Sequence, residues 1–315
     1  MRWKMGAFHS RKILGLCLLS ILGFILLTPT PSVAVVEHDD LTGVKVAIYN
    51  GEGVMISSRT ALTRMFEWMN ASVEEVNASQ ILDGILDDYD MLVIPGGSET
   101  ICCSELDYIE GVRKIQDFVR NGGSYFGICG GATYGANYVD FFNGSMSPVS
   151  EPGSLIHMTT MNVNQSSNGP ELSDLPVSFA TMYYGSQCFI PRAGFAVHIV
   201  ASYEYNDEAG MIAFEYGNGT VFLSSPHPEY EEDSDRDDTT FGDDLDDPES
   251  EWDLLLRVSK WLIESSYVEP SGSTTTSTPT PTAINTLDLP IIAVASAGSI
   301  IAVLVVAVFY RRMNA

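Results

Sequence analysis

Short apolar segments alternate with helical patterns in the first half of the chain, and this alternation constrains the fold most. Residues 43–50, 91–97 and 124–129 are apolar, strand-length runs that end at or beside glycine. Residues 57–70 and 104–123 lie between them and carry apolar side chains at helical spacing. Strands that alternate with helices pair in parallel through right-handed crossovers. We therefore expect an α/β fold with a mostly parallel sheet flanked by helices.

The second half of this region has a different pattern. From residue 150 onward, strand-like segments follow one another with little helical pattern between them. Residues 217–219 (Gly-Asn-Gly) have the composition of a hairpin turn. A last amphipathic helix is predicted over residues 249–266. We expect β-hairpin additions to the sheet late in the chain.

The N-terminal residues have the order of a secretory signal peptide. Basic residues precede an apolar run, and a small-residue site, Ser32-Val33-Ala34, follows it. We therefore predict a signal peptide over residues 1–34, with an uncleaved membrane anchor as the alternative. The domain is then expected over residues 35–268.

The C-terminal residues predict a stalk and a membrane anchor. Residues 269–288 are rich in Ser, Thr and Pro, and residues 289–310 are apolar over the length that spans a bilayer. Arg311 and Arg312 begin the short tail 311–315, and positive residues stay on the cytoplasmic side. We expect a single-pass protein of the cell membrane, with an extracellular domain and a cytoplasmic C-terminus.

The charge of the chain limits its partners. A formal net charge of −25 disfavours nucleic acid and anionic lipid as ligands. The acidic segment, residues 230–251, is interpreted as a solvated loop; weak calcium binding is the alternative, although Asp238 stands where an EF-hand loop needs glycine. We predict no metal site and no cofactor. Possible glycan sites in an exported chain are Asn70, Asn77, Asn143, Asn164 and Asn218.

A single cysteine among glycines, in YFGICGGATYGA (125–136), is the main candidate for chemistry. Sites in parallel α/β sheets form beyond the carboxyl ends of the strands. A strand-to-helix turn at Cys129 would need glycines for its tight angle, and the helix N-terminus would favour a thiolate. The alternative is a small core residue beside a tight turn.

Two other strand ends supply groups that a nucleophile requires. His227 and Glu229 follow an apolar run, and the carboxylate of such a pair can orient the imidazole, which can then deprotonate a thiol. Gly96 and Gly97 end another apolar run, and their backbone amides could face an anion. A rigid His-Pro-Glu loop and a plain glycine turn are the alternatives.

This combination resembles the class I glutamine amidotransferase-like superfamily, whose fold is flavodoxin-like. It is most similar to the amidotransferase-like N-terminal domain of biotin–protein ligases. The resemblance covers most of residues 43–232. The motifs that carry it are YNGEG (49–53), VIPGGSE (93–99), FVRNGG (118–123), FGICGGATYGA (126–136), YYG (183–185) and SSPHPEY (224–230).

The resemblance implies roles for particular residues. The nucleophile, its base and the carboxylate that orients the base would be Cys129, His227 and Glu229. Oxyanion or substrate contacts would come from Gly130, from Gly96 or Gly97, and from Glu52 after the first strand, although Glu52 can equally be a plain loop residue.

The resemblance also has limits, because Ala132 and Thr133 occupy positions where ordinary glutaminases carry a His-Gln pair. No biotin-ligase half follows the domain. The expected function is therefore a cell-surface cysteine hydrolase of an amide or related acyl bond, acting on an unknown small molecule or peptide. The alternative is a non-catalytic ectodomain that keeps the fold and binds a ligand or protein.

The remaining cysteines bear on the redox state. In the relatives, the loops that carry Cys102, Cys103 and Cys188 border one pocket, and exported chains tend to oxidise their thiols. If a disulfide forms, the resemblance implies that it joins Cys188 to Cys102 or Cys103 and leaves Cys129 free.

Overall fold

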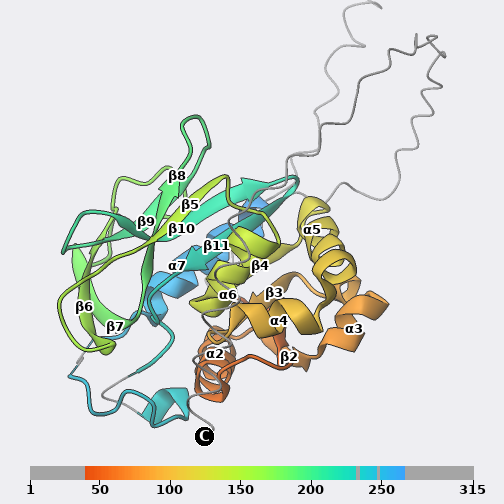
Figure 1. The fold of residues 1–315 in the computed structure, drawn as a ribbon, viewed down its shortest axis with the longest axis horizontal. Coiled ribbons are helices and arrows are strands. Elements are labelled where there is room, and N and C mark those ends of the chain that lie inside the picture. Colours follow the sequence, from red (N-terminus) through yellow and green to blue (C-terminus); the bar gives the residue numbers. More distant parts are fainter. Residues whose placement is uncertain (1–39, 232–234, 247–248, 267–315) are drawn as a thin grey trace, which may run out of the picture. The chain divides into compact units, whose positions relative to one another are not determined.

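Eleven strands form one sheet in the described part of the chain (Figure 1). The computed structural model describes residues 40–231, 235–246 and 249–266. The main order of strands is β2-β1-β3-β4-β11-β10-β9-β6-β7, and β5 and β8 pair beside β10.

The helices and strands follow a β-α alternation up to β4 and become mainly strands after it. The strands are β1 (Lys45–Tyr49), β2 (Ser72–Val76), β3 (Met91–Ile94), β4 (Ser124–Ile128), β5 (Gly144–Pro148), β6 (Ile156–Val163), β7 (Ser178–Tyr184), β8 (Gln187–Pro191), β9 (His198–Tyr203), β10 (Ala209–Tyr216) and β11 (Gly219–Ser224). The α-helices are α2 (Ile56–Trp68), α3 (Ala78–Asp83), α4 (Glu99–Glu105), α5 (Val112–Arg120), α6 (Gly130–Thr133) and α7 (Trp252–Ser265). Shorter turns of other helical types are η1 (Ile85–Asp88), η2 (Asp107–Gly111), η3 (Tyr134–Tyr138) and η4 (Asp235–Asp237).

The sheet is mixed, so the prediction of an α/β fold with flanking helices is confirmed but the expectation of a mostly parallel sheet is wrong. β2, β1, β3, β4 and β11 are parallel. From β10 onward the pairs are antiparallel. The predicted hairpin explains the change, because Tyr216 pairs with Gly219 across a two-residue turn, and such a short connection permits only antiparallel strands.

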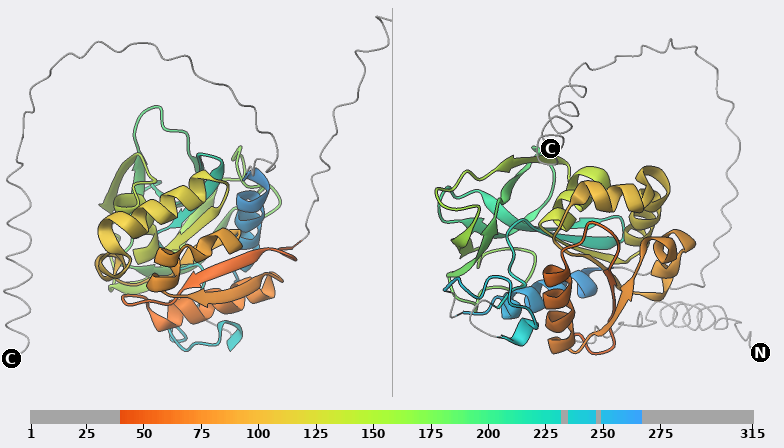
Figure 2. Two further views of the ribbon diagram at one scale, coloured as in Figure 1. Left: turned by 90° about the vertical axis from the view of Figure 1, so that its right-hand side faces the viewer. Right: turned by 60° about the horizontal axis from the view of Figure 1, so that its bottom comes forward.

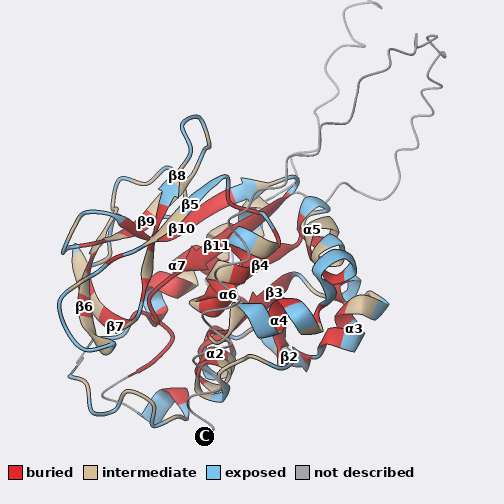
Figure 3. Cartoon of the chain, in the orientation of Figure 1, coloured by how far each residue is buried: buried red, intermediate tan, exposed pale blue. Residues whose placement is uncertain are grey.

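Both faces of β1, β3, β4 and β11 are buried, because helices cover each face (Figures 2 and 3), whereas the edge strand β2 is largely exposed. Val46 and Ile48 of β1 pack in a cluster with α2 and α7, while Ala47 and Tyr49 pack in a second cluster with α3, α4 and α5. Side chains alternate between the faces of a strand. Continuous apolar runs such as β1 are therefore what a doubly covered strand requires.

The long helix predicted over residues 104–123 is interrupted. It begins earlier, at Glu99, and Asp107 adopts a left-handed backbone with φ of 65° between α4 and α5. This break rotates the following turn, so Ile109 is 79% exposed although it fits the apolar stripe of a continuous helix. Ile115 of α5 is fully buried.

All four described cysteines are free thiols, so the structure contains no disulfide between Cys188 and Cys102 or Cys103. Cys102 and Cys103 belong to α4 and pack in the cluster on one face of the sheet, and Cys188 packs in the cluster on the other face. The Cys188 thiol instead donates a hydrogen bond to Glu208 Oε2 over 2.9 Å.

The acidic segment, residues 230–251, is more than a solvated loop. Glu231 and Asp237 are buried, and burial raises the pKa of Asp237 to about 6. Arg236 forms an ion pair with Glu231 over 2.6 Å and lies 4.0 Å from the ring centre of Trp252. These contacts fix part of the segment against α7.

The predicted signal peptide, stalk, transmembrane helix and tail lie outside the described residues. Among the residues that the structure describes, no helix is long and apolar enough to cross a membrane. The chain divides into one unit of residues 1–269 and another of residues 270–315. All described residues belong to the first unit.

The interrupted helix can be tested with two isoleucines of the same region. Ile115→Ala removes fully buried methyl groups and should lower the free energy of unfolding by about 2–5 kcal/mol. Ile109→Ala should change it by no more than about 0.5 kcal/mol, because the side chain is exposed. Urea denaturation of both variants measures the difference. Equal losses would show that the helix is continuous and buries both residues.

Candidate active site

Parallel pairing of three neighbouring strands brings the predicted site residues together. Ile94 of β3 is in register with Gly127 of β4, and Ile128 of β4 is in register with Ser224 of β11. The carboxyl ends of the three strands therefore meet at one edge of the sheet. Cys129 follows β4 there, and its N–H donates to Ser224 O over 2.8 Å.

Cys129 lies on a sharp turn between β4 and α6. Its backbone has φ of 49° and ψ of −109°, a conformation that a residue with a side chain rarely adopts. A Cβ at Gly130 would lie 2.1 Å from Gly97 O, and a Cβ at Gly131 would lie 2.0 Å from Ile94 O. Glycine is therefore required at both positions, because the turn packs directly against the backbone that follows β3.

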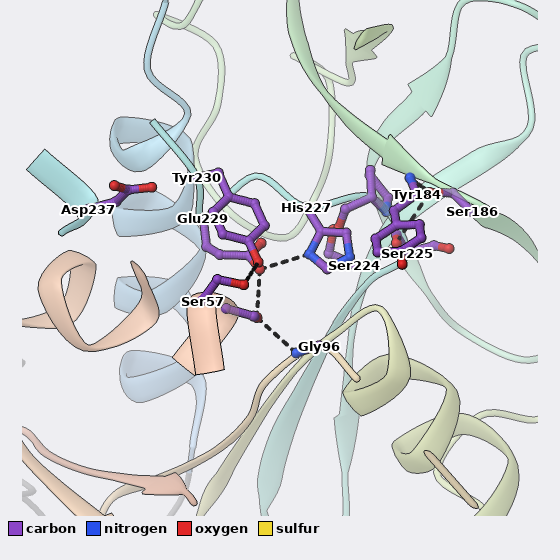
Figure 4. Close-up of polar contacts among 12 residues, drawn as sticks. Ser57, Gly96, Tyr184, Ser186, Ser224, Ser225, His227, Glu229, Tyr230 and Asp237 are labelled. Carbon is purple, nitrogen blue, oxygen red and sulfur yellow. Dashed lines mark hydrogen bonds and ion pairs between the residues drawn. The ribbon is translucent and has the colours of Figure 1, made fainter. Parts of the chain in front are cut away.

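His227 and Glu229 form a fully buried pair beyond β11 (Figure 4). His227 Nδ1 lies 2.8 Å from Glu229 Oε1. The backbone N–H of His227 donates to Met182 O over 3.0 Å, which fixes the residue against β7. The rings of Tyr184 and Tyr230 lie 6.0 and 5.5 Å from the imidazole and enclose it.

Cys129 and His227 each favour the charged form of the other. Burial raises the pKa of the Cys129 thiol, but the charge of His227 outweighs burial, and the pKa falls below its usual value. Burial lowers the pKa of His227, but Glu229 and Cys129 outweigh it and raise the pKa well above its usual value. Nδ1 of His227 is engaged by Glu229, and its Nε2 is buried with no hydrogen-bond partner among the described residues, so Nε2 is the atom that is available to the thiol. The arrangement favours a thiolate beside an imidazolium.

Ser58 of α2 joins this network and was not predicted. The sequence suggests a helix cap at the serines that begin residues 57–70, but the N-cap position is Met55 and no side chain caps the helix. Ser58 is fully buried, and its hydroxyl donates to Glu229 Oε1 over 2.7 Å. The only sequence signal is a second hydroxyl in the first helical turn, which is common in helices.

The glycine loop, residues 96–97, lies against both groups. Gly96 N–H donates to Ser58 Oγ over 2.9 Å, so this amide is already engaged. A Cβ at Gly97 would lie 2.0 Å from Gly53 O. The backbone N–H of Gly130 lies beside the Cys129 sulfur and lowers the pKa of the thiol. Of the glycines in the predicted set, Gly97 and Gly130 remain candidates for binding an oxyanion.

Glu52 is tied to α4. Its side chain is exposed, its backbone N–H donates to Glu105 Oε2 over 2.5 Å, and its carbonyl accepts from the Cys102 thiol over 3.5 Å. These contacts assign Glu52 a place in the loop after β1. Among the described residues, no group of three His, Cys, Asp or Glu side chains is placed to hold a metal ion.

Comparison with known proteins agrees with the first part of the chain. Residues 44–154 match the family model "Biotin-protein ligase, N terminal". The chain is 27% identical over 215 residues to the biotin–protein ligase of Schizosaccharomyces pombe. The match covers 59% of this chain and 33% of that protein. It is 29% identical over 158 residues to an uncharacterized protein of Chlamydia muridarum. That match covers 44% of this chain and 60% of that protein. The chain thus spans about a third and about 60% of the lengths of these relatives.

A solved structure shows a similar fold. PurLQS from Thermotoga maritima matches with a TM-score of 0.50 and 17% identity, over 70% of this chain and 99% of that chain. At this identity the likeness concerns the fold alone. The resemblance expected from the motifs is confirmed: residues 44–154 are similar to the N-terminal domain of biotin–protein ligases.

Proposed function

We propose that this chain is a cysteine-dependent hydrolase of an amide or related acyl bond, with Cys129, His227 and Glu229 as its catalytic residues. One observation carries the proposal: the strained turn at Cys129 meets the fully buried His227–Glu229 pair at the carboxyl ends of β4 and β11, and the charge of His227 lowers the pKa of the thiol. Ordinary buried cysteines have raised pKa values. The buried His227–Glu229 pair supplies the opposing charge.

The geometry supports a two-step reaction. The Cys129 thiolate attacks the carbonyl carbon, and the amides of Gly97 and Gly130 would stabilise the oxyanion that develops. The imidazolium of His227 gives its proton to the leaving amine, and a thioester to Cys129 remains. His227 then removes a proton from water, which attacks the thioester. The tetrahedral intermediate expels the Cys129 thiolate and releases the acid product, and the proton that His227 took from water makes the imidazolium that restores the ion pair.

Two positions at which this chain differs from ordinary glutaminases limit the class of substrate that we propose. Ala132 and Thr133 replace the His-Gln pair of ordinary glutaminases, so we propose an amide other than free glutamine. A weak contact occupies this place, since Gln187 Nε2 donates to Thr133 Oγ1 over 3.5 Å. The match covers 33% of the S. pombe ligase, so the activity of that whole protein is not carried over to this chain.

The proposed location is the cell surface. It depends on the sequence of the two ends, where a signal peptide is predicted over residues 1–34 and a transmembrane helix over residues 289–310. The hydrolase would face the exterior, bound to the membrane through residues 269–288 and the helix that follows. Glycan attachment at the exposed sequons belongs to the same proposal.

The first prediction concerns the selectivity of thiol alkylation. At about pH 6, iodoacetamide should modify Cys129 far faster than the other thiols, because a lowered pKa leaves more thiolate at that pH. Burial raises the pKa of Cys102 to about 12 and the pKa values of Cys103 and Cys188 to about 11. Peptide mass spectrometry over time measures each rate. A Cys129 that reacts only after denaturation would favour the non-catalytic binding protein.

The second prediction concerns the base. His227→Gln keeps a polar side chain but cannot carry a positive charge, so the pKa of Cys129 should rise. Alkylation at about pH 6 should then slow by roughly tenfold or more. His157→Gln is the matched control, since His157 also lies near a carboxylate, 3.8 Å from Glu151, but on β6. Similar rates for both variants would remove His227 from the proposed mechanism.

The third prediction concerns topology. Protease added to intact cells should release the domain by cleavage within residues 269–288 and leave a C-terminal tag undigested. Permeabilised cells serve as the control, in which the tag should also be lost. A domain that stays protected while the tag is digested would reverse the proposed orientation.

A further inference from the structure

We propose that Ser58 is a positioning residue that holds the carboxylate of Glu229 and the glycine loop, residues 96–97, in one geometry. The inference rests on the proposed function, because it concerns how that site is held. It assigns a role to a residue outside the motifs that identify the family domain. Ser58 contacts neither the Cys129 sulfur nor a substrate in this proposal, and it acts through its two partners.

The hydrogen bonds of Ser58 have a fixed direction. Gly96 can only donate through its N–H, and this bond to Ser58 Oγ is 2.9 Å long. The hydroxyl proton of Ser58 is therefore free to point at Glu229 Oε1, which lies 2.7 Å away. All three groups are buried, so water does not compete for these bonds. A bond from a hydroxyl to a buried carboxylate is among the stronger hydrogen bonds in proteins.

Ser58 determines which oxygen of Glu229 faces the imidazole. Oε1 accepts from both Ser58 and His227, whereas Oε2 is buried and has no hydrogen-bond partner among the described residues. Without the hydroxyl, a single bond to His227 would hold the carboxylate, which could rotate about its side-chain axis. The charge that favours imidazolium would then be less well aligned with Nδ1.

Ser58 also determines how close the glycine loop lies to the imidazole. A Cβ at Gly96 would lie 2.6 Å from His227 Cε1 and 3.2 Å from Ser58 Oγ. The loop backbone thus packs against the edge of the ring, and Ser58 is the hydrogen-bond partner of its N–H at that point. Gly97, the proposed oxyanion donor, is the next residue. One hydroxyl therefore links the base to the oxyanion donor.

The neighbouring serine provides a matched control. Ser57 is half-buried, and its hydroxyl lies 2.9 Å from Tyr230 Oη. It has the same size, occupies the same helical turn and does not contact Glu229 or Gly96. Ser57→Ala should change the alkylation rate of Cys129 by less than about twofold.

The test measures the pH profile of Cys129 alkylation in the full chain with iodoacetamide. Ser58→Ala should move the profile to higher pH and slow alkylation at about pH 6 roughly five- to tenfold. Hydrogen exchange at the Gly96 amide should become faster in the same variant. A profile and an exchange rate equal to those of Ser57→Ala would overturn the inference. Ser58→Thr and Ser58→Val, which differ only in hydroxyl against methyl, give the same comparison if the alanine variant does not fold.

A double-mutant cycle separates positioning from general destabilisation. If Ser58 acts through the carboxylate, Ser58→Ala should have little further effect on alkylation in a Glu229→Gln background. Independent, additive effects of the two substitutions would contradict the inference. A wild-type Cys129 that shows no enhanced reactivity would instead reject the proposed function and, with it, this role. Normal wild-type reactivity with an unchanged Ser58→Ala profile would reject the role of Ser58 alone.

Discussion

The parallel pairing of β4 with β11 is the constraint on which the site depends. It places Ser224 beside Ile128, and so brings His227 to Cys129 although about 100 residues separate them in sequence. The intervening chain builds the antiparallel part of the sheet and returns as β11. That part also supplies Met182, whose carbonyl accepts from the N–H of His227. The antiparallel strands are therefore support for the base as well as an extension of the sheet.

Burial gives this arrangement its electrostatic strength. His227 and Glu229 are fully buried, and opposite charges attract more strongly away from water. A buried carboxylate is costly unless it is paired and hydrogen-bonded. Glu229 Oε1 meets that condition through His227 and Ser58. The proposed chemistry thus relies on a network that extends from α2 to the residues after β11. Loss of either His227 or Ser58 would leave the buried charge of Glu229 less well compensated.

Much of this could be predicted from sequence because it follows from local pattern. Apolar runs that end beside glycine identify β1, β3 and β4. The glycines that surround Cys129 predicted the turn at that residue. The directions of the strands after residue 150 could not be predicted from the sequence, because they depend on which edge of the sheet each hairpin joins. The predicted burial of Ile109 was wrong, because the left-handed backbone of Asp107 interrupts the helix and rotates the turn that follows. Ser58 was missed because a buried hydroxyl bond to Glu229 joins residues 171 positions apart, and helical spacing carries no sign of it.

The central claim is that His227 ionises Cys129 near neutral pH, and the ultraviolet absorbance of the thiolate measures it most directly. The difference in absorbance between the wild-type domain and Cys129→Ser, followed across pH, isolates this one thiol. The account predicts a thiolate signal whose midpoint lies below the usual thiol pKa of about 8.5. A midpoint at or above that value in the folded protein would contradict it.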